Sequence, residues 1–174
     1  MLTRLIIPKQ AVGASLVYFD LFNAAGSCSR LEILSVLPIV SGAVIVTGTL
    51  AVDLFLTRTT AVGTGGTAAT QGGTSLTAAM FSPHNWEGAM EPSITARLTP
   101  TGGATAGNVL SFRSVFSEET NAGTYTPSVD MVRHLYADIP PLVVKAGTGL
   151  RVVQGGVASV GNIGFDVLFR IVKR

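Results

Sequence analysis

The segment Ala43–Arg58 constrains the fold more than any other part of the chain. From Val44 to Leu56 its even positions are apolar, interrupted only by Gly48, and its odd positions include threonines and Asp53. Because successive side chains of a strand point to opposite faces of a sheet, this pattern predicts a long strand with one buried face and one partly wet face. The Gly/Thr-rich run 61–74 that follows it predicts a long loop without regular structure.

The composition indicates that much of the molecular surface is in contact with either lipid or other protein chains. Hydrophobic residues make up 47% of the 174 residues and charged residues only 13%, whereas a typical soluble domain is about 25% charged. A chain of this length is expected to form one domain, residues 1–174, large enough to bury a sizeable core. So few charges leave two classes of protein: one that crosses a membrane, or one that covers its surface against other chains.

The uncharged stretch Ile33–Val52 is long enough to span a bilayer as a helix. Pro38, Gly42 and Gly48 interrupt it, and its alternation with period two is typical of strands. We therefore expect no membrane segment. The stretch is predicted to form two core strands joined by a turn near Pro38–Gly42.

The N-terminal residues, the single cysteine and the net charge argue against secretion, an internal disulfide and nucleic-acid binding. Residues 1–10 lack the apolar core of a secretory signal, so we expect mature protein made in a cytosol. Cys28 is the single cysteine, which excludes an internal disulfide. A net charge of +2 does not indicate nucleic-acid binding, and the basic residues Arg170, Lys173 and Arg174 are expected to form a solvated strand end.

Strand patterns separated by turn residues recur along the whole chain. The predicted strands are 2–7, 15–22, 30–40, 43–58, 93–98, 109–116, 142–145, 150–154 and 163–171. About eight strands with long Gly/Thr loops predict an all-β fold, a jelly-roll-like antiparallel β-sandwich. Two stretches break the pattern: 76–91 is expected to begin with a helical turn and continue as loop, and 126–136 to form a short helix or an irregular strand.

The last strands carry more specific expectations. In 163–171 the apolar odd positions are predicted to face the core, while Asp166 and Arg170 face solvent. The strands 142–145 and 150–154 flank a turn rich in glycine and are expected to form a hairpin-like connection, with positive φ at glycine.

The glycine-rich and acidic motifs do not predict catalysis. The run 61–74 lacks the Gly-Lys-Ser/Thr of a phosphate-binding loop, and no helix pattern follows it directly. Glu118 and Glu119 are adjacent in sequence, whereas the paired carboxylates of glycosidases come from different strands facing one cleft. Both glutamates are therefore expected in a solvated loop.

The histidines also argue against an enzyme. His84 and His134 are the only two, and with Glu87, Glu91 or Asp138 they would be the candidates for a metal or hydrolytic site. A cupin-type metal centre on a jelly roll needs several clustered histidines, and no nucleophile elbow presents a serine. We therefore expect no enzymatic activity, no metal and no cofactor.

Three large apolar side chains lie in the segment bounded by proline and glycine: Phe81, Trp86 and Met90. A lone tryptophan in such a segment is costly to leave in water. It either caps one end of the core or anchors the chain in a neighbouring subunit, where aromatic residues are enriched. These three residues are the predicted partner contacts.

Four runs resemble a type of virion structural protein of tailed bacteriophages. They are DLFLTRTTAVGTGGTAAT (53–70), ARLTPTGGATAG (96–107), FSEETNAGTY (116–125) and KAGTGLRVVQGGVASVGNIGFDVLFRIV (145–172). The resemblance implies a jelly-roll-like sandwich assembled on a virion surface, without enzymatic activity. It carries over no functional residue, because the matching motifs are turns, strand faces and loop glycines.

These observations together predict a non-enzymatic virion structural protein. Its most concrete form is a capsid decoration or cement protein that forms homotrimers and contacts the major capsid protein or other virion proteins. Such a protein is assembled in the host cytoplasm and stays in the virion. The loops 60–75 and 76–91 are the expected contact regions, and a role in the neck, tail or head fibre uses the same physics.

Two other classes of function stay open. A carbohydrate-binding or other adhesive sandwich module would stack Trp86 with Tyr125 or Tyr136 on a sugar, which requires aromatic rings that lie coplanar on one face. A hydrolase on the same scaffold would require His84 and His134 to lie within about 10 Å of each other, the reach of a shared metal or hydrogen-bonded site.

Overall fold

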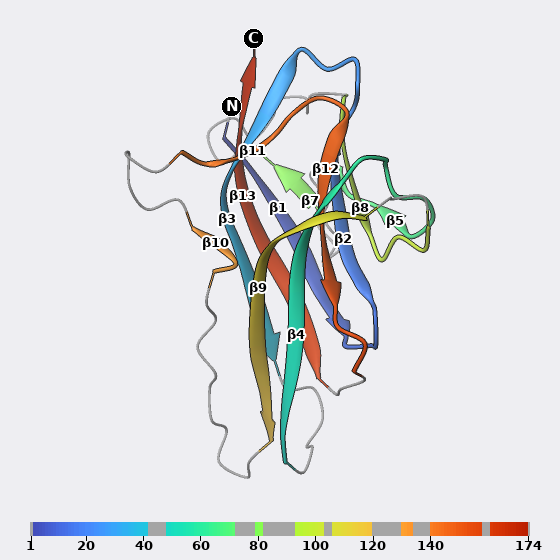
Figure 1. The fold of residues 1–174 in the computed structure, drawn as a ribbon, viewed down its shortest axis with the longest axis vertical. Helices are drawn as coiled ribbons and strands as arrows, with labels where there is room; N and C mark the ends of the chain where they lie inside the picture. The colour runs from blue at the N-terminus through green and yellow to red at the C-terminus, as the bar shows by residue number, and fades with distance from the viewer. Residues whose placement is uncertain are drawn as a thin grey trace.

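The chain is all-β in a computed structural model that describes residues 2–41, 48–71, 79–81, 93–102, 106–119, 130–133, 140–157 and 161–173. Two sheets pack face to face with their long strands running along the long axis of the molecule (Figure 1). Among the described residues no helix is long and apolar enough to cross a membrane.

One sheet, called here the β13 sheet, has the strand order β10-β3-β13-β1-β7-β6, with β11 also paired to β3. Its strands are β1 (Leu2–Ala11), β3 (Ser29–Ser41), β6 (Thr70–Gln71), β7 (Ala79–Phe81), β10 (Val132–Arg133), β11 (Leu142–Val144) and β13 (Asn162–Lys173). The other, the β4 sheet, has the order β5-β8-β2-β12-β4-β9. Its strands are β2 (Val17–Asn23), β4 (Gly48–Thr59), β5 (Thr67–Ala68), β8 (Ile94–Leu98), β9 (Ala106–Glu119) and β12 (Thr148–Gln154).

The order of the long strands is that of a jelly roll. The chain alternates between the sheets, so that β1-β13-β3 lie opposite β2-β12-β4-β9, and β10 and β11 complete the first layer beside β3. All of these pairs are antiparallel, and the short pair β6–β7 is parallel. The arrangement confirms the predicted jelly-roll-like β-sandwich.

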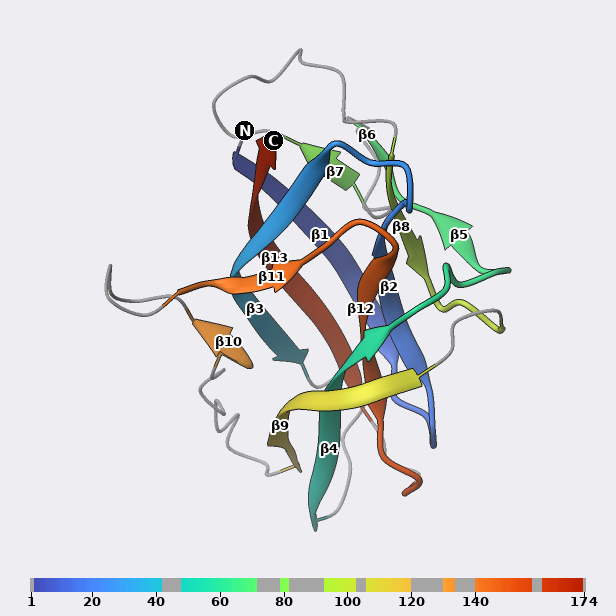
Figure 2. The same cartoon turned by 45° about the horizontal axis from the view of Figure 1, so that its top comes forward.

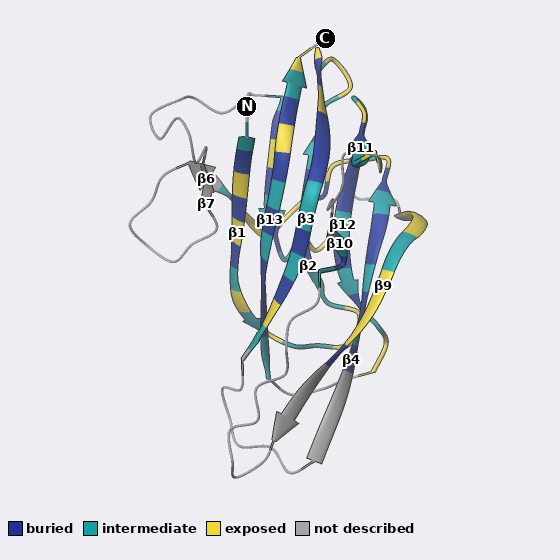
Figure 3. Ribbon diagram, turned by 90° about the vertical axis from the view of Figure 1, so that its left-hand side faces the viewer, coloured by how far each residue is buried: buried dark blue, intermediate teal, exposed yellow. Residues whose placement is uncertain are grey.

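The core lies between the two sheets. Buried residues alternate with exposed ones along the first half of β1 and with intermediate or exposed ones along β13 from Phe165 on, as Figure 3 shows by colour. The apolar odd positions of β13 are buried, as predicted, and Arg170 is exposed. Phe165 lies at the centre of the contact, with its ring centroid 5.2 Å from that of Tyr18 and 5.5 Å from that of Phe19 in the opposite sheet.

The turn predicted near Pro38–Gly42 is wrong at Pro38, which lies inside β3 and pairs with Phe165 of β13; Gly42 lies outside the described residues. Among the described residues, β10 and β11 pair only with positions 31–36 of β3, so Pro38 lies at an edge. A residue without an N–H group is tolerated there. The strands on either side of the expected turn also lie in different sheets rather than side by side.

The predicted hairpin over 142–154 is also wrong. β11 pairs with β3 in the β13 sheet, whereas β12 lies between β2 and β4 in the other sheet. The connection therefore crosses the sandwich. Gly147 has the expected positive φ, 75°, and its N–H donates to the carbonyl of Asn23 at 2.8 Å.

Several smaller expectations are corrected by strand pairing. Residues 79–81 of the segment 76–91, expected as a helical turn followed by loop, form a strand beside β1, and 76–78 and 82–91 lie outside the described residues. Glu118 and Glu119 lie in β9 rather than in a loop. The Gly/Thr-rich run contains β5 and β6. In 126–136, β10 bears out the irregular strand over two residues, and 126–129 and 134–136 lie outside the described residues.

Candidate partner-binding surface

The predicted contact residues are only partly within the described chain. Phe81 is the last residue of β7, where its backbone pairs with Arg4 of β1. Trp86 and Met90 lie outside the described residues, so the contact of these three side chains stays a prediction. Tyr125 and Tyr136, the sugar-stacking candidates, lie outside them as well.

The expected chemistry around the histidines is likewise untested. His84 and His134 lie outside the described residues, together with the acidic residues considered beside them. Within the described ranges, no three histidine, cysteine, aspartate or glutamate side chains lie close enough to hold a metal ion. The single cysteine, Cys28, is exposed and free.

An apolar row crosses the outer face of the β4 sheet. The residues are in register across neighbouring strands: Phe112 of β9 pairs with Phe55 of β4, Phe55 with Val153 of β12, and Val153 with Val17 of β2. Phe55 and Val153 alternate with buried neighbours such as Leu54, so their side chains face away from the core, and the ring of Phe112 lies against that of Phe55 on the same face. We call these four residues the outer row.

The outer row is most exposed at the edge of the sheet. Phe112 is 46% exposed and Val109, also on β9, is 56% exposed. The rings of Phe112 and Phe55 lie 5.2 Å apart with their planes at 41°. The outer face of an antiparallel sheet is usually polar, so an aromatic pair that extends from β4 to the edge strand β9 marks this face as a candidate interface.

A charged row runs beside the outer row on the same face. Arg151 of β12 pairs with Asp20 of β2, and Asp20 pairs with Arg97 of β8. Asp20 is only 1% exposed although it points away from the core, because the Gly-rich segment after β4 covers it. The Gly-rich run singled out in the sequence therefore packs against the carboxylate of Asp20.

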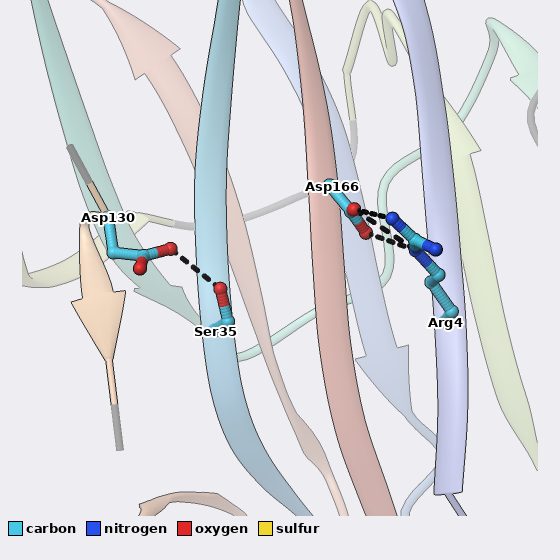
Figure 4. Close-up of polar contacts among 4 residues, drawn as sticks. All are labelled: Arg4, Ser35, Asp130 and Asp166. Atoms are coloured by element: carbon cyan, nitrogen blue, oxygen red, sulfur yellow. Dashed lines mark hydrogen bonds and ion pairs between the residues drawn. The ribbon is translucent and has the colours of Figure 1, made fainter. Parts of the chain in front are cut away.

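Ion pairs and a hydrogen bond link neighbouring segments on the outer face of the β13 sheet. Arg4 of β1 is paired with Asp166 of β13, and the Ser35 hydroxyl of β3 donates to Asp130 Oδ1 at 2.6 Å (Figure 4). Nearby, Glu32 accepts from Arg30 at 2.8 Å and from Arg170 at 3.0 Å. Its side chain is 9% exposed, so this carboxylate bridges two strands from a nearly buried position.

The Glu32 bridge predicts a specific dependence of stability on pH. Burial alone would raise the pKa of Glu32, but the hydrogen bond from Arg30 and the charges of Arg170 and Arg30 outweigh burial and lower the pKa below its ordinary 4.5. A carboxyl with a lowered pKa in the folded state stabilises fully above its ordinary value, and this contribution is lost as pH falls through the lowered pKa.

The variant Glu32→Gln should therefore lose about 1 kcal/mol of unfolding free energy near neutral pH, since both arginines are half exposed. In urea titrations, the difference from wild type should shrink steadily as the pH falls below 4.5. A difference that stays constant down to acid pH would show that the charge of Glu32 contributes nothing.

Sequence reasoning missed the outer row and the covered Asp20. A usable signal existed for Asp20, which is the single charge within the apolar run 15–22. For the outer row the signal was weak, because its members come from four separate strands. No protein family, curated protein or solved structure matches this chain.

Proposed function

We propose that this chain is a non-enzymatic virion structural protein, a capsid decoration or cement protein of a tailed bacteriophage. Its copies associate as a homotrimer and bind the major capsid protein or other virion proteins. The observation that carries the proposal is the outer row, whose aromatic end lies exposed on the edge strand β9. The four sequence runs that resemble virion proteins support it.

The proposed mechanism is burial of apolar area between subunits. Only 13% of the residues are charged, so little charge needs to be desolvated when two copies meet. Each square ångström of apolar surface removed from water contributes about 25 cal/mol, less the cost of ordering the partners. Contacts repeated around a shell would stabilise it without any chemical step.

The aromatic geometry favours a protein partner over a sugar. A stacking platform needs coplanar rings, and the planes of Phe55 and Phe112 meet at 41°. Side chains of a second protein adapt to tilted rings, which commonly pack in such arrangements. The carbohydrate-binding alternative therefore rests on Trp86, Tyr125 and Tyr136 alone.

Light scattering coupled to size exclusion tests the oligomer directly. Over a wide range of concentration the chain should elute with three times its monomer mass of 18.0 kDa. A second experiment mixes the protein with heads of the phage that carries its gene, prepared without it, and sediments them. Saturable co-sedimentation is expected. A monomer at every concentration that also fails to sediment with the heads would overturn the proposal.

A further inference from the structure

Residues 60–66, called here the strap, lie over the outer face of the β4 sheet between β4 and β5 (Figure 2). The backbone N–H of Gly63 donates to Oδ2 of Asp20. The strap also makes hydrogen bonds to β8 and to the segment after it: Arg97 Nη1 of β8 donates to the carbonyl of Gly65 at 3.1 Å, and Thr64 N–H donates to the carbonyl of Gly102 at 2.7 Å.

Close approach explains the glycines of the strap. A Cβ atom at Gly63 would lie 2.5 Å from Oδ2 of Asp20 and 2.9 Å from Cβ of Pro100. Gly66 has a φ of +63°, and a Cβ there would lie 1.9 Å from the carbonyl oxygen of Leu98. Glycine at both positions lets the backbone come into contact with the sheet.

The strap is held by polar contacts and not by the core. None of its residues belongs to the buried apolar cluster, and Val62, its largest side chain, is 39% exposed. Lifting the strap would therefore break hydrogen bonds but expose little apolar surface. Segments with few buried apolar contacts open at a lower free energy than the protein unfolds.

Asp20 is the group beneath the strap. Its Oδ1 is buried and has no hydrogen-bond partner within the described chain. The charged groups that face it are Arg151 on β12 and Arg97 on β8, and residues 60–66 contribute no titratable side chain. Burying a carboxylate with one unsatisfied oxygen costs free energy. The hydrogen bond between Gly63 and Asp20 therefore holds the strap closed over a group whose burial is itself unfavourable.

We propose that Asp20 is the latch of the strap: its side-chain oxygen, by accepting from the Gly63 N–H, holds residues 60–66 closed, and the strap opens as a unit while the sandwich stays folded. Opening uncovers the charged row formed by Asp20, Arg97 and Arg151. This proposal is independent of the proposed function, because it concerns one copy of the chain and requires no partner.

The charge of Asp20 sets the direction of the pH dependence. Burial raises the pKa of Asp20, and the Gly63 hydrogen bond and the two arginines only partly offset it. In the open state the carboxyl is solvated and has its ordinary pKa of 3.8. The closed state therefore binds a proton more tightly, so opening becomes easier as the pH rises through the raised pKa.

Amide hydrogen exchange, followed by NMR on the full chain, tests the latch. In the wild type, the amides of Gly63 and Thr64 should exchange faster than those of Leu150 and Val152 in β12. In Asp20→Ala, which removes the acceptor, protection of the strap amides should fall by more than about tenfold, with β12 unchanged.

Asp20→Asn keeps an acceptor oxygen and removes the charge, so protection should persist and lose its dependence on pH. Asp53→Asn is the matched control, because Asp53 faces the same side of the sheet and accepts from Ser114 at 2.6 Å. It should leave strap exchange unchanged.

Either of two results would overturn the latch. One is strap amides that exchange at the same rate as β12 in the wild type, since opening would then require global unfolding. The other is unchanged protection of Gly63 in Asp20→Ala. Should that variant fail to fold, Gly63→Ala provides the second test, because its Cβ would lie 2.5 Å from Oδ2 of Asp20, so that the carboxylate or the strap must shift and the contact between them is lost. Unchanged protection of the Thr64 amide in that variant would likewise overturn the latch.

Discussion

Replacing Phe165 by alanine is expected to lower the free energy of unfolding by about 3–5 kcal/mol. The side chain is 0% exposed, and its ring contacts those of Tyr18 and Phe19 across the two sheets. Removing it costs the transfer free energy of the ring and leaves a cavity between layers that β-strands cannot easily close. A domain stabilised by about 5–15 kcal/mol would lose a large share of its margin.

Urea denaturation followed by circular dichroism measures this loss. Ile39→Ala is the control, because Ile39 lies on the neighbouring strand β3 but is 37% exposed on the outer face. It should cost less than about 1 kcal/mol. If Phe165→Ala proved as mild as the control, the contact between the sheets at this position would be wrong.

The fold was predictable where one strand carried the whole signal. The alternation of 163–171 and the apolar even positions of 52–56 each report a single buried face, and the structure buries them accordingly. Pairing was not predictable, because it depends on segments far apart in sequence. β1 pairs with β13, whereas β11 and β12, separated by a short turn, lie in different sheets.

The candidate surface was less predictable for the same reason. Phe55 falls among the odd positions assigned to a partly wet face, and nothing local indicates that Phe112 and Val153 lie beside it. The close approach of Gly63 to Asp20 joins residues 43 positions apart. A run of glycines indicates a backbone with unusual freedom, but the packing partner that requires it becomes visible only in three dimensions.

For the proposed homotrimer, replacing Phe112 by aspartate is expected to abolish self-association while the sandwich stays folded. Phe112 is already 46% exposed in a single copy, so a charge there costs the monomer little. In an interface, the same change removes an aromatic contact and buries an unpaired carboxylate. Losing an aromatic hot spot of about 2 kcal/mol or more weakens association by at least about 30-fold.

Light scattering should then give the monomer mass of 18.0 kDa for Phe112→Asp, with an unchanged circular dichroism spectrum. Val157→Asp is the matched control, because Val157 is the most exposed large apolar residue in the described chain, at 72%, and lies outside the outer row. If both variants stay trimeric, the outer row is not the interface. If both variants dissociate, an added charge disrupts the assembly wherever it is introduced, and the experiment assigns the subunit contact to no particular surface, the outer row included. Only loss in Phe112→Asp alone places the subunit contact on the outer face of the β4 sheet, since the two variants differ in where the charge is introduced and not in its kind.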